Sequence, residues 1–413
     1  MNQSYQGARQ IRTTCCIAGG GPAGMMLGLL LARAGVEVIV LEKHGDFLRD
    51  FRGDTIHPST LELMHELGML DEFLRLPHQE LRRVKIQFDD VEIAGPDFSR
   101  LPTRCKFIAL MPQWDFLNFL AAQAKQYPTF QLMMNTEATG LIEDGGSIVG
   151  VKANTEQGEL NIYASLVVGA DGRSSALRER ARMAVEDFGV PIDVLWFRVT
   201  KTAADTEPAL GRIRNGKMLV TIDRGDYYQC GSIIRKGAFE GIKRRGLAAF
   251  REEIARVAPF LRNAIGEIDD WEKVKLLTVQ VNRLHQWYRP GLLFIGDAAH
   301  AMSPAGGVGI NLAIQDAVAS ANLLADQLRR GDCEAGDLRR VQQRREWPAR
   351  MTQTIQVFIH RRMFGSRSEP ERALSFSWPA RAILWLLTPL LRRGAARVIG
   401  IGFRAEHIRP NLL

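Results

Sequence analysis

The sequence lacks the cysteine patterns that would indicate a disulfide framework or a zinc site. Its 413 residues include five cysteines, none of which forms a CxxC pair or a cluster with histidine. Disulfide scaffolds and structural zinc sites both need closely spaced cysteines. We therefore expect no metal site and a reducing compartment. Cys15 and Cys16 lie in an apolar run, so we interpret them as small buried hydrophobic residues.

Long apolar segments are also absent. The N-terminal stretch MNQSYQGARQIRTT has no apolar core of the kind found in signal peptides. No uncharged run reaches the roughly 18–20 residues of a membrane-spanning helix. These absences predict a cytoplasmic protein whose contact with membranes is at most peripheral. Apolar residues make up 46% of the chain and charged residues 24%, which is typical of a globular protein.

Lysine is absent from residues 331–413, where arginine is abundant. This region has fifteen arginines and seven acidic residues, so it carries the whole net charge of +8. Such a basic region is typical of contact with nucleic acid, with an anionic membrane or with an acidic protein surface. Because no basic patch interleaved with aromatic residues occurs elsewhere, we expect no nucleic-acid partner.

A glycine-rich loop near the N-terminus has the setting of a dinucleotide-binding fingerprint. The expected order is a strand at 15–18, the glycines Gly19, Gly21 and Gly24, a helix at 25–34, a strand at 36–41 and the acid Glu42. The first glycine permits the turn, the second lets the backbone approach a pyrophosphate, and the third lets helix and strand pack closely. The helix N-terminus would bind the phosphates, and the acid would bind the ribose. Alone, this fingerprint does not distinguish NAD from FAD.

Three further segments follow in a characteristic order. RGDTIHPSTLELMHELGM begins at Arg52, GADGRSSALRERA contains Asp171, and GLLFIGDAAHAMSPAGGVGINLAIQDA contains Asp297. Together with the glycine loop, they resemble the single-component, FAD-dependent aromatic hydroxylases built like 4-hydroxybenzoate hydroxylase. The resemblance covers about residues 12–330, and the last segment matches the family motif at nearly every position.

The resemblance implies that separate loops bind one FAD. Asp297 would hydrogen-bond the ribitol chain, and the loop from Pro304 to Asn311 would pass beside the isoalloxazine ring. A helix N-terminus there would stabilise the negative charge of the reduced ring. His300 is assigned to the turn rather than to catalysis. The expected cofactor-binding residues are Gly19, Gly21, Pro22, Ala23, Gly24, Glu42, Lys43, Arg52, Gln113, Ala138, Asp171, Gly296, Asp297, Pro304, Gly307, Val308, Gly309, Ile310 and Asn311.

Two of these residues have a second interpretation. Arg52 would lie either near the pyrophosphate or at the approach of the nicotinamide, with Asp171 orienting it through a charge-assisted hydrogen bond. Gln113 matches a position where the family places Arg or Gln against the cofactor, but a glutamine there also suits the start of a helix.

The chain is predicted to have an α/β fold with two interleaved domains and a C-terminal helical, Arg-rich region. A Rossmann-like FAD-binding domain of the GR2 type would alternate with an antiparallel β-sheet substrate domain, whose strands are expected in alternating runs such as 84–88, 194–199 and 227–234. The expected ranges are 12–80, 111–185 and 284–330 for the FAD-binding domain, 81–110 and 186–283 for the substrate domain, and 331–413 for the C-terminal region.

The resemblance implies a monooxygenase that hydroxylates an aromatic or quinone-like small molecule. NADH or NADPH would bind transiently, because no second GxGxxG motif is present, and O2 would then form a flavin C4a-hydroperoxide that transfers oxygen to the ring. The pocket would have to exclude water, and the flavin itself would perform the chemistry. The residues predicted to contact substrate or take part in catalysis are Arg52, His57, Arg198 and Tyr228.

Further substrate-contact candidates lie on the same predicted strands. Trp196, Tyr227 and Gln229 are among them. Strand alternation places Tyr227 and Gln229 on one face and Tyr228 and Cys230 on the other, without indicating which face looks at the flavin.

Alternatives remain open for the activity and for the C-terminal region. The same FAD domain could serve a halogenase, although no WxWxIP motif is present, or a prenyl-chain reductase, or a non-catalytic flavin-binding redox sensor. The apolar segment 378–403, flanked by arginines, predicts either helices packed over the FAD domain or a homodimer partner, or an interfacial segment on anionic lipid.

Overall fold

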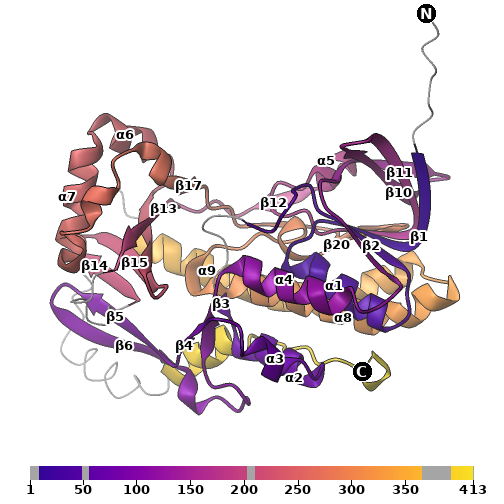
Figure 1. Cartoon of the computed structure of the whole chain (residues 1–413), viewed down its shortest axis with the longest axis horizontal. Coiled ribbons are helices and arrows are strands. Elements are labelled where there is room, and N and C mark those ends of the chain that lie inside the picture. Colours follow the sequence, from indigo (N-terminus) through magenta and orange to yellow (C-terminus); the bar gives the residue numbers. More distant parts are fainter. Residues whose placement is uncertain (1–8, 49–54, 202–209, 365–391, 413) are drawn as a thin grey trace, which may run out of the picture.

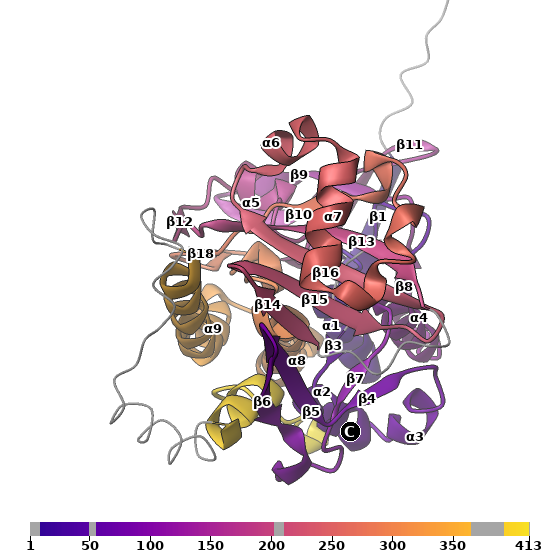
Figure 2. The ribbon, with the colours of Figure 1, turned by 90° about the vertical axis from the view of Figure 1, so that its left-hand side faces the viewer.

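The structure is a computed structural model and describes residues 9–48, 55–201, 210–364 and 392–412. These residues form two lobes along the long axis of the molecule (Figure 1). The first lobe contains a mainly parallel sheet with helices beneath it. The second contains another sheet that helices cover on its outer side (Figure 2). The predicted α/β fold with a Rossmann-like domain and a separate β-sheet is therefore confirmed.

The sheet of the first lobe has eight strands. Its parallel part has the order β20-β11-β1-β2-β8, while β9, β10 and β19 add antiparallel partners. Where parallel strands are buried on both faces they are nearly continuous apolar runs. The strands are β1 (Arg9–Ala18), β2 (Val38–Leu41), β8 (Phe130–Met133), β9 (Glu137–Asp144), β10 (Ser147–Thr155), β11 (Gly158–Gly169), β19 (Tyr288–Arg289) and β20 (Leu292–Phe294).

Helices α1 (Pro22–Arg33), α4 (Gln113–Ala124) and α8 (Val308–Arg330) lie beneath the parallel strands (Figure 1). The first of them begins at Pro22 rather than at residue 25, because proline suits the first position of a helix. Among the described residues, one helix, spanning Ala305–Arg330, is long and apolar enough for a membrane span, but 83% of its apolar window is buried. Such burial is typical of a core helix.

The sheet of the second lobe has seven strands in the order β17-β13-β16-β15-β14-β5-β6. All neighbours are antiparallel except β14 and β5, which run parallel, so the predicted antiparallel sheet is wrong for this one pair. The two strands come from separate insertions, and no hairpin sets their direction. The strands are β5 (Arg83–Phe88), β6 (Val91–Asp97), β13 (Ile192–Thr200), β14 (Gly211–Arg214), β15 (Lys217–Asp223), β16 (Tyr227–Arg235) and β17 (Lys275–Leu277).

Two small sheets combine strands from both predicted domains. The predicted boundaries near residues 80, 185 and 284 fall inside strands of these two sheets. Hydrogen-bonded strands therefore connect the two lobes where the sequence predicts a division. One sheet has the order β3-β7-β4, and the other pairs β12 with β18. The strands are β3 (Thr55–Ile56), β4 (Gln79–Leu81), β7 (Ile108–Leu110), β12 (Val185–Asp187) and β18 (Asn282–Leu284). The remaining helices of the two lobes are α2 (Pro58–Glu66), α3 (Leu70–Phe73), α5 (Ala176–Arg180), α6 (Phe239–Arg244) and α7 (Leu247–Val257).

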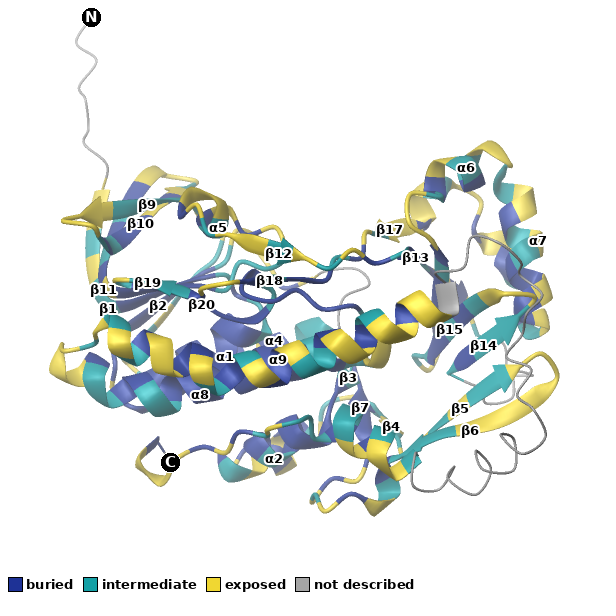
Figure 3. Ribbon diagram, turned by 180° about the vertical axis from the view of Figure 1, so that it is seen from behind, coloured by how far each residue is buried: buried dark blue, intermediate teal, exposed yellow. Residues whose placement is uncertain are grey.

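The C-terminal region packs on both lobes where it is described. Helix α9 (Ala335–Phe364) runs along the back of the molecule (Figure 3), and residues 392–400 form a further helix. Ile408 and Leu412 lie in the main core, and Arg33 donates a hydrogen bond to the Leu412 carbonyl oxygen at 3.1 Å. Residues 365–391, which include most of the predicted interfacial segment, lie outside the described residues.

Candidate active site

The first glycine loop forms an open cradle at the N-terminus of α1. Gly21 is the N-cap residue, and no side chain caps the free N–H groups of the first turn. A Cβ at Gly24 would lie 2.0 Å from the Gly19 carbonyl oxygen, whereas a Cβ at Gly21 would meet no atom within 4 Å. The chain itself therefore requires glycine at Gly24 for packing, while the space beside Gly21 suits a pyrophosphate on the helix N-terminus.

Glu42 stabilises this loop from the end of β2. Its Oε2 accepts a hydrogen bond from the Gly20 N–H and its Oε1 accepts one from the His44 N–H, both at 3.1 Å. Lys43 is exposed beside it, and Ala138 on β9 is partly buried against the main core. The carboxylate thus lies next to the cradle, where the ribose is expected.

The segments around Asp171 and Asp297 lie opposite each other. Arg173 Nη2 lies 3.3 Å from Asp297 Oδ2, and Arg178 Nη1 donates to the Ala298 carbonyl oxygen at 3.0 Å. Asp171 Oδ2 accepts a hydrogen bond from the Leu177 N–H at 3.2 Å. Its Oδ1 and Arg173 Nη1 are buried without a hydrogen-bond partner among the described residues, and burial raises the pKa of Asp171. Such polar atoms need partners, and a hydroxyl- and phosphate-rich cofactor would supply them.

The sequence points to only one of the two arginines in this group as a site residue. Arg178 is one of the residues by which the segment GADGRSSALRERA resembles the family, whereas Arg173 was not predicted as a site residue. The one signal for it was a charged side chain directly after Asp171-Gly172. Arg52, predicted to bond Asp171, lies outside the described residues.

The second glycine loop ends at the N-terminus of α8. Gly307 is the N-cap residue with a left-handed φ of 64°, and no side chain caps the helix. Thr55 Oγ1 donates to the Gly307 carbonyl oxygen at 3.0 Å, which ties the loop to β3. The N–H groups of Val308, Gly309 and Ile310 therefore have no acceptor within the helix and can stabilise negative charge. Pro304 begins the 3-10 turn before them.

Asn311 and Gln113 flank this loop in different ways. The Asn311 side chain is buried, and its Oδ1 accepts hydrogen bonds from the hydroxyls of Ser59 at 2.8 Å and Thr60 at 2.9 Å. The side chain therefore holds α2 against α8 and is not available to a cofactor. Gln113 is the first residue of α4, a position compatible with both of its interpretations.

His300 is held in place by contacts that support the second glycine loop. Its Nε2 lies 2.5 Å from Asp316 Oδ2, the side chain is buried, and its ring packs against Trp287. This placement agrees with its assignment to the turn.

The two faces of the second sheet are clearly distinguished by packing. Tyr228 is fully buried in the cluster formed with α7, and its ring meets Phe260 edge-on at 5.4 Å. Trp196, on the opposite face, packs in the cluster that contains Ile108 and Ile399, which lie beside β3 and the second glycine loop. The sheet thus separates Tyr228 from the flavin loops. A catalytic role for Tyr228 does not fit this placement, since its side chain lies on the face that the helices cover. The sequence left this open because strand alternation does not show which face of a sheet is inward.

Arg198 and Gln229 share the inward face. They are direct neighbours across β13 and β16, and Arg198 alternates with the helix-facing Phe197 and Val199. Gln229 is 5% exposed, and its Oε1 accepts a hydrogen bond from Arg224 at 3.3 Å. The inward face therefore offers the exposed guanidinium of Arg198 and the buried amide of Gln229, whose oxygen Arg224 binds.

His57 connects the flavin loop region to the C-terminal helix. It is fully buried at the start of α2, and its Nδ1 donates to the Ile399 carbonyl oxygen at 2.6 Å. Burial lowers the pKa of His57 to about 4, against the smaller opposing effect of hydrogen bonds to the Ile399 and Gly307 backbone. His57 is therefore neutral at pH 7. It serves as a donor between the two segments rather than as a proton-transfer group.

This pKa predicts a specific dependence of stability on pH. The folded-state pKa lies below the unfolded value of about 6.5, so the unfolded chain binds a proton that the folded chain excludes, and stability falls as pH decreases from about 6.5 towards about 4. Between pH 7 and pH 5 this group should remove about 2 kcal/mol from the free energy of unfolding. Urea denaturation of wild type and His57→Gln at both pH values measures it. An identical pH dependence in the two proteins would contradict the buried neutral state.

Comparison with known proteins agrees with this geometry. Residues 12–354 match the family described as FAD binding domain. The chain is 31% identical over 402 residues to 6-methylpretetramide 4-monooxygenase of Streptomyces rimosus. This match covers 97% of this chain and 95% of that protein. It is 27% identical over 326 residues to rifampicin monooxygenase of Rhodococcus hoagii, covering 73% of this chain and 61% of that longer protein.

Solved structures share the fold. The p-nitrophenol 4-monooxygenase PnpA of Pseudomonas putida superposes with a TM-score of 0.78 at 18% identity, covering 96% of this chain and all of that one (100%). The anhydrotetracycline hydroxylase OxyS of Streptomyces rimosus gives 0.73 at 21% identity, covering 96% and 77%. The predicted family, cofactor and enzyme class are confirmed: the chain belongs to the FAD-dependent aromatic hydroxylases and is a flavin-dependent monooxygenase.

Proposed function

We propose that the protein hydroxylates a planar phenolic or quinone-like substrate held between the inward face of the second sheet and the flavin loops. The observation that carries this proposal is that the α1 and α8 N-termini, at Gly21 and Gly307, are uncapped and that the loop before α8 meets Ile399, which packs in the same cluster as Trp196. Support also comes from relatives whose names specify 6-methylpretetramide and pentachlorophenol as substrates. NADH or NADPH is the proposed reductant, in line with a relative named as an NADH-specific resorcinol 4-hydroxylase.

Trp196 and Gln229 are the proposed centre of the substrate face, with Arg198 at its edge. A Cβ at Gly231 would lie 3.0 Å from the Trp196 ring, so the missing side chain lets the indole lie across β16. Gln229 Nε2 is buried without a hydrogen-bond partner among the described residues. A flat aromatic surface beside a buried amide donor suits a ring that carries a carbonyl or phenolate oxygen. Tyr228 is left out of this face.

The chain's own residues would bind, orient and enclose, while FAD supplies oxygen activation and electrophilic oxygen transfer when bound. The α1 N-terminus would hold the pyrophosphate, and Asp171 and Asp297 would bind hydroxyl groups. The α8 N-terminus would stabilise the anionic reduced ring. The apolar residues around Trp196 and Ile222 would exclude water from the reacting ring.

The test is a screen of NADH and NADPH oxidation with phenols, quinolines and polycyclic quinones. Mass spectrometry scores the gain of one oxygen, and a peroxide assay measures uncoupled turnover. A stimulated rate with an oxygenated product supports the proposal. Halide-dependent products would favour a halogenase, and reduction of a prenyl chain would favour a reductase. If no aromatic compound stimulates the oxidation of NADH or NADPH, the result would favour the redox sensor.

We also propose that a cytoplasmic pool of the protein contacts anionic membranes through α9. This helix exposes four large apolar residues, and three of them lie within seven positions of two exposed arginines near its C-terminal end. Apolar side chains beside arginines suit an anionic bilayer surface. The residues are Trp347, Ile355, Phe358, Ile359, Arg361 and Arg362.

Point variants test this surface better than deletion of the C-terminal region, since Ile408 and Leu412 lie in the core. Wild type should float with phosphatidylserine-containing vesicles but not with phosphatidylcholine alone, and Phe358→Ser with Ile359→Ser should abolish flotation. Phe358→Leu is the matched control and should float normally. If wild type does not float, and sedimentation shows that wild type is a dimer while the double serine variant is a monomer, the surface is a homodimer interface instead.

A further inference from the structure

Asp316 of α8 is a buried carboxylate that organises the loop before Asp297. It is 0% exposed and receives three donors: the Gly296 N–H at 3.0 Å, His300 Nε2 at 2.5 Å and Arg345 Nε at 3.0 Å. Burial alone would raise the pKa of Asp316, but His300 and Arg345 outweigh it, so the pKa is lowered and the group is a carboxylate. The Gly296 N–H therefore points at a fixed negative charge.

Arg345 connects this carboxylate to the C-terminal segment. Its side chain is 1% exposed, and its Nη1 donates to the Arg404 carbonyl oxygen at 3.0 Å and to Glu406 Oε1 at 3.2 Å. The Glu406 N–H in turn bonds Gln315, the neighbour of Asp316. One guanidinium thus joins α8, α9 and residues 404–406 across a long separation in sequence.

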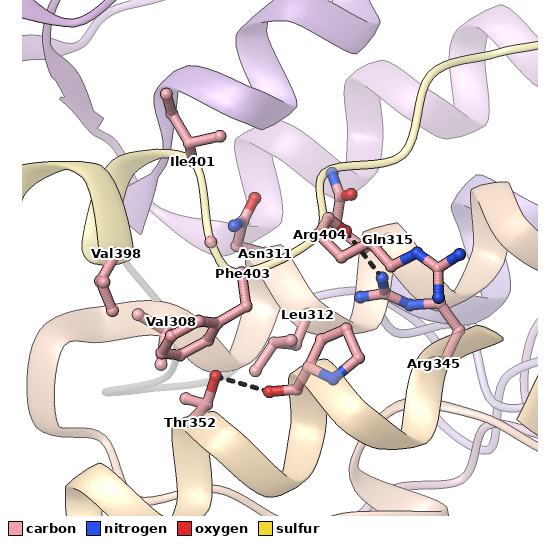
Figure 4. A pocket seen from close by; sticks show the side chains of 12 residues that line it. Val308, Asn311, Leu312, Gln315, Arg345, Thr352, Val398, Ile401, Phe403 and Arg404 are labelled. Atoms are coloured by element: carbon pink, nitrogen blue, oxygen red, sulfur yellow. Dashed lines mark hydrogen bonds between the residues drawn. The ribbon is translucent and has the colours of Figure 1, made fainter. Parts of the chain in front are cut away.

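The surroundings of Arg345 leave little room for water. The adjacent cavity of about 30 Å³ has room for one or two water molecules and is lined by residues of α8, α9 and the C-terminal segment (Figure 4). Loss of the guanidinium would leave Asp316 as a buried charge with two of its three donors, in a space too small for bulk water to replace the third.

The Gly296–Ala298 turn is held from two sides. Arg173 and Arg178 bind it from the first, through Asp297 Oδ2 and the Ala298 carbonyl oxygen. Asp316 binds it from the second, through the Gly296 N–H. Because Asp297 is the next residue, the second contact sets the direction of its side chain.

We propose that Arg345 is a positioning residue for FAD: it fixes Asp316, and through Gly296 it orients Asp297, which sets the affinity for FAD. Neither Arg345 nor Glu406 belongs to the motifs that identify the cofactor site. The proposal uses FAD binding alone and does not depend on the identity of the substrate.

Arg344 provides a matched control on the same helix. It binds Glu406 through two hydrogen bonds, at 2.8 and 3.0 Å, but the contacts described for it do not include Asp316. A variant at Arg344 therefore loosens the C-terminal segment without removing the partner of Asp316.

The experiment compares Arg345→Gln with Arg344→Gln in the full chain. Titration of each apo-protein with FAD, followed by quenching of flavin fluorescence, gives Kd, and the visible absorption band of the bound flavin reports its surroundings. We expect Kd to rise at least about 30-fold for Arg345→Gln and less than about threefold for Arg344→Gln. The flavin band should change shape only for the former.

Two further measurements keep the comparison decisive. Thermal unfolding of the apo-proteins separates altered positioning from lost folding. If Arg345→Gln does not fold, Arg345→Lys, which keeps the charge but loses the fork, should fold and bind FAD with an intermediate Kd. Wild-type Kd in Arg345→Gln or Arg345→Lys, or an equal rise for Arg344→Gln, would overturn the proposal.

Discussion

A Gly21→Val variant is expected to fold like wild type and to bind FAD at least about 100-fold more weakly. The N-cap residue has φ −74° and ψ −176°, an extended conformation that valine adopts without strain. A Cβ there meets no atom of the described residues within 4 Å, so a side chain can begin at this position without a collision. The valine would occupy the space in which the pyrophosphate approaches the free N–H groups of α1.

Fluorescence titration with FAD and thermal unfolding of the apo-protein measure the two halves of this expectation. Gly336→Ala is the control, because a Cβ at this glycine also meets no atom and lies far from the loop in sequence. It should leave both quantities unchanged. Wild-type FAD affinity in Gly21→Val would show that the cofactor does not use the α1 N-terminus.

A Gly307→Ala variant is expected to retain FAD but to lose oxygen transfer by at least about 100-fold. Gly307 has a φ of 64°, and a Cβ there would lie 2.3 Å from Thr55 Oγ1. A left-handed alanine costs about 1–2 kcal/mol, and the collision adds to it, so the loop at the start of α8 must move. The N–H groups that stabilise the reduced ring would then be misdirected, while the pyrophosphate cradle stays intact.

The midpoint potential of the bound flavin gives a readout that needs no substrate. Each tenfold loss of stabilisation of the two-electron reduced form should lower the potential by about 30 mV. Adding Thr55→Ala removes the colliding hydroxyl and should restore part of the potential, but not the part due to the left-handed conformation. An unchanged potential and full oxygen transfer in Gly307→Ala would contradict a role of this loop at the ring.

The local features of the site could be predicted from the sequence. Each of these features depends on residues close together in the chain: the first glycine loop, Glu42, and the segments around Asp171 and Asp297. Their order along the chain is typical of the family. Backbone geometry then follows directly, as at Gly24, where packing admits no side chain.

What the sequence could not indicate depends on long-range packing. Alternation along β16 fixed that Tyr228 and Gln229 lie on opposite faces, but only the position of α6 and α7 shows which face is covered. Likewise, Asp316, Arg345 and Glu406 lie far apart in sequence and carry no shared pattern. The parallel pairing of β14 with β5 is a third case, since it joins two separate insertions.

The most direct test of the central claim is one turnover of the FAD-loaded enzyme, reduced with the nicotinamide that the screen identifies, in the presence of isotopically labelled dioxygen and a phenol from the same screen. We expect one labelled oxygen atom per product molecule, and we expect the Gly21→Val protein to yield none without excess FAD. A product without the label, or equal product from protein freed of flavin, would contradict it.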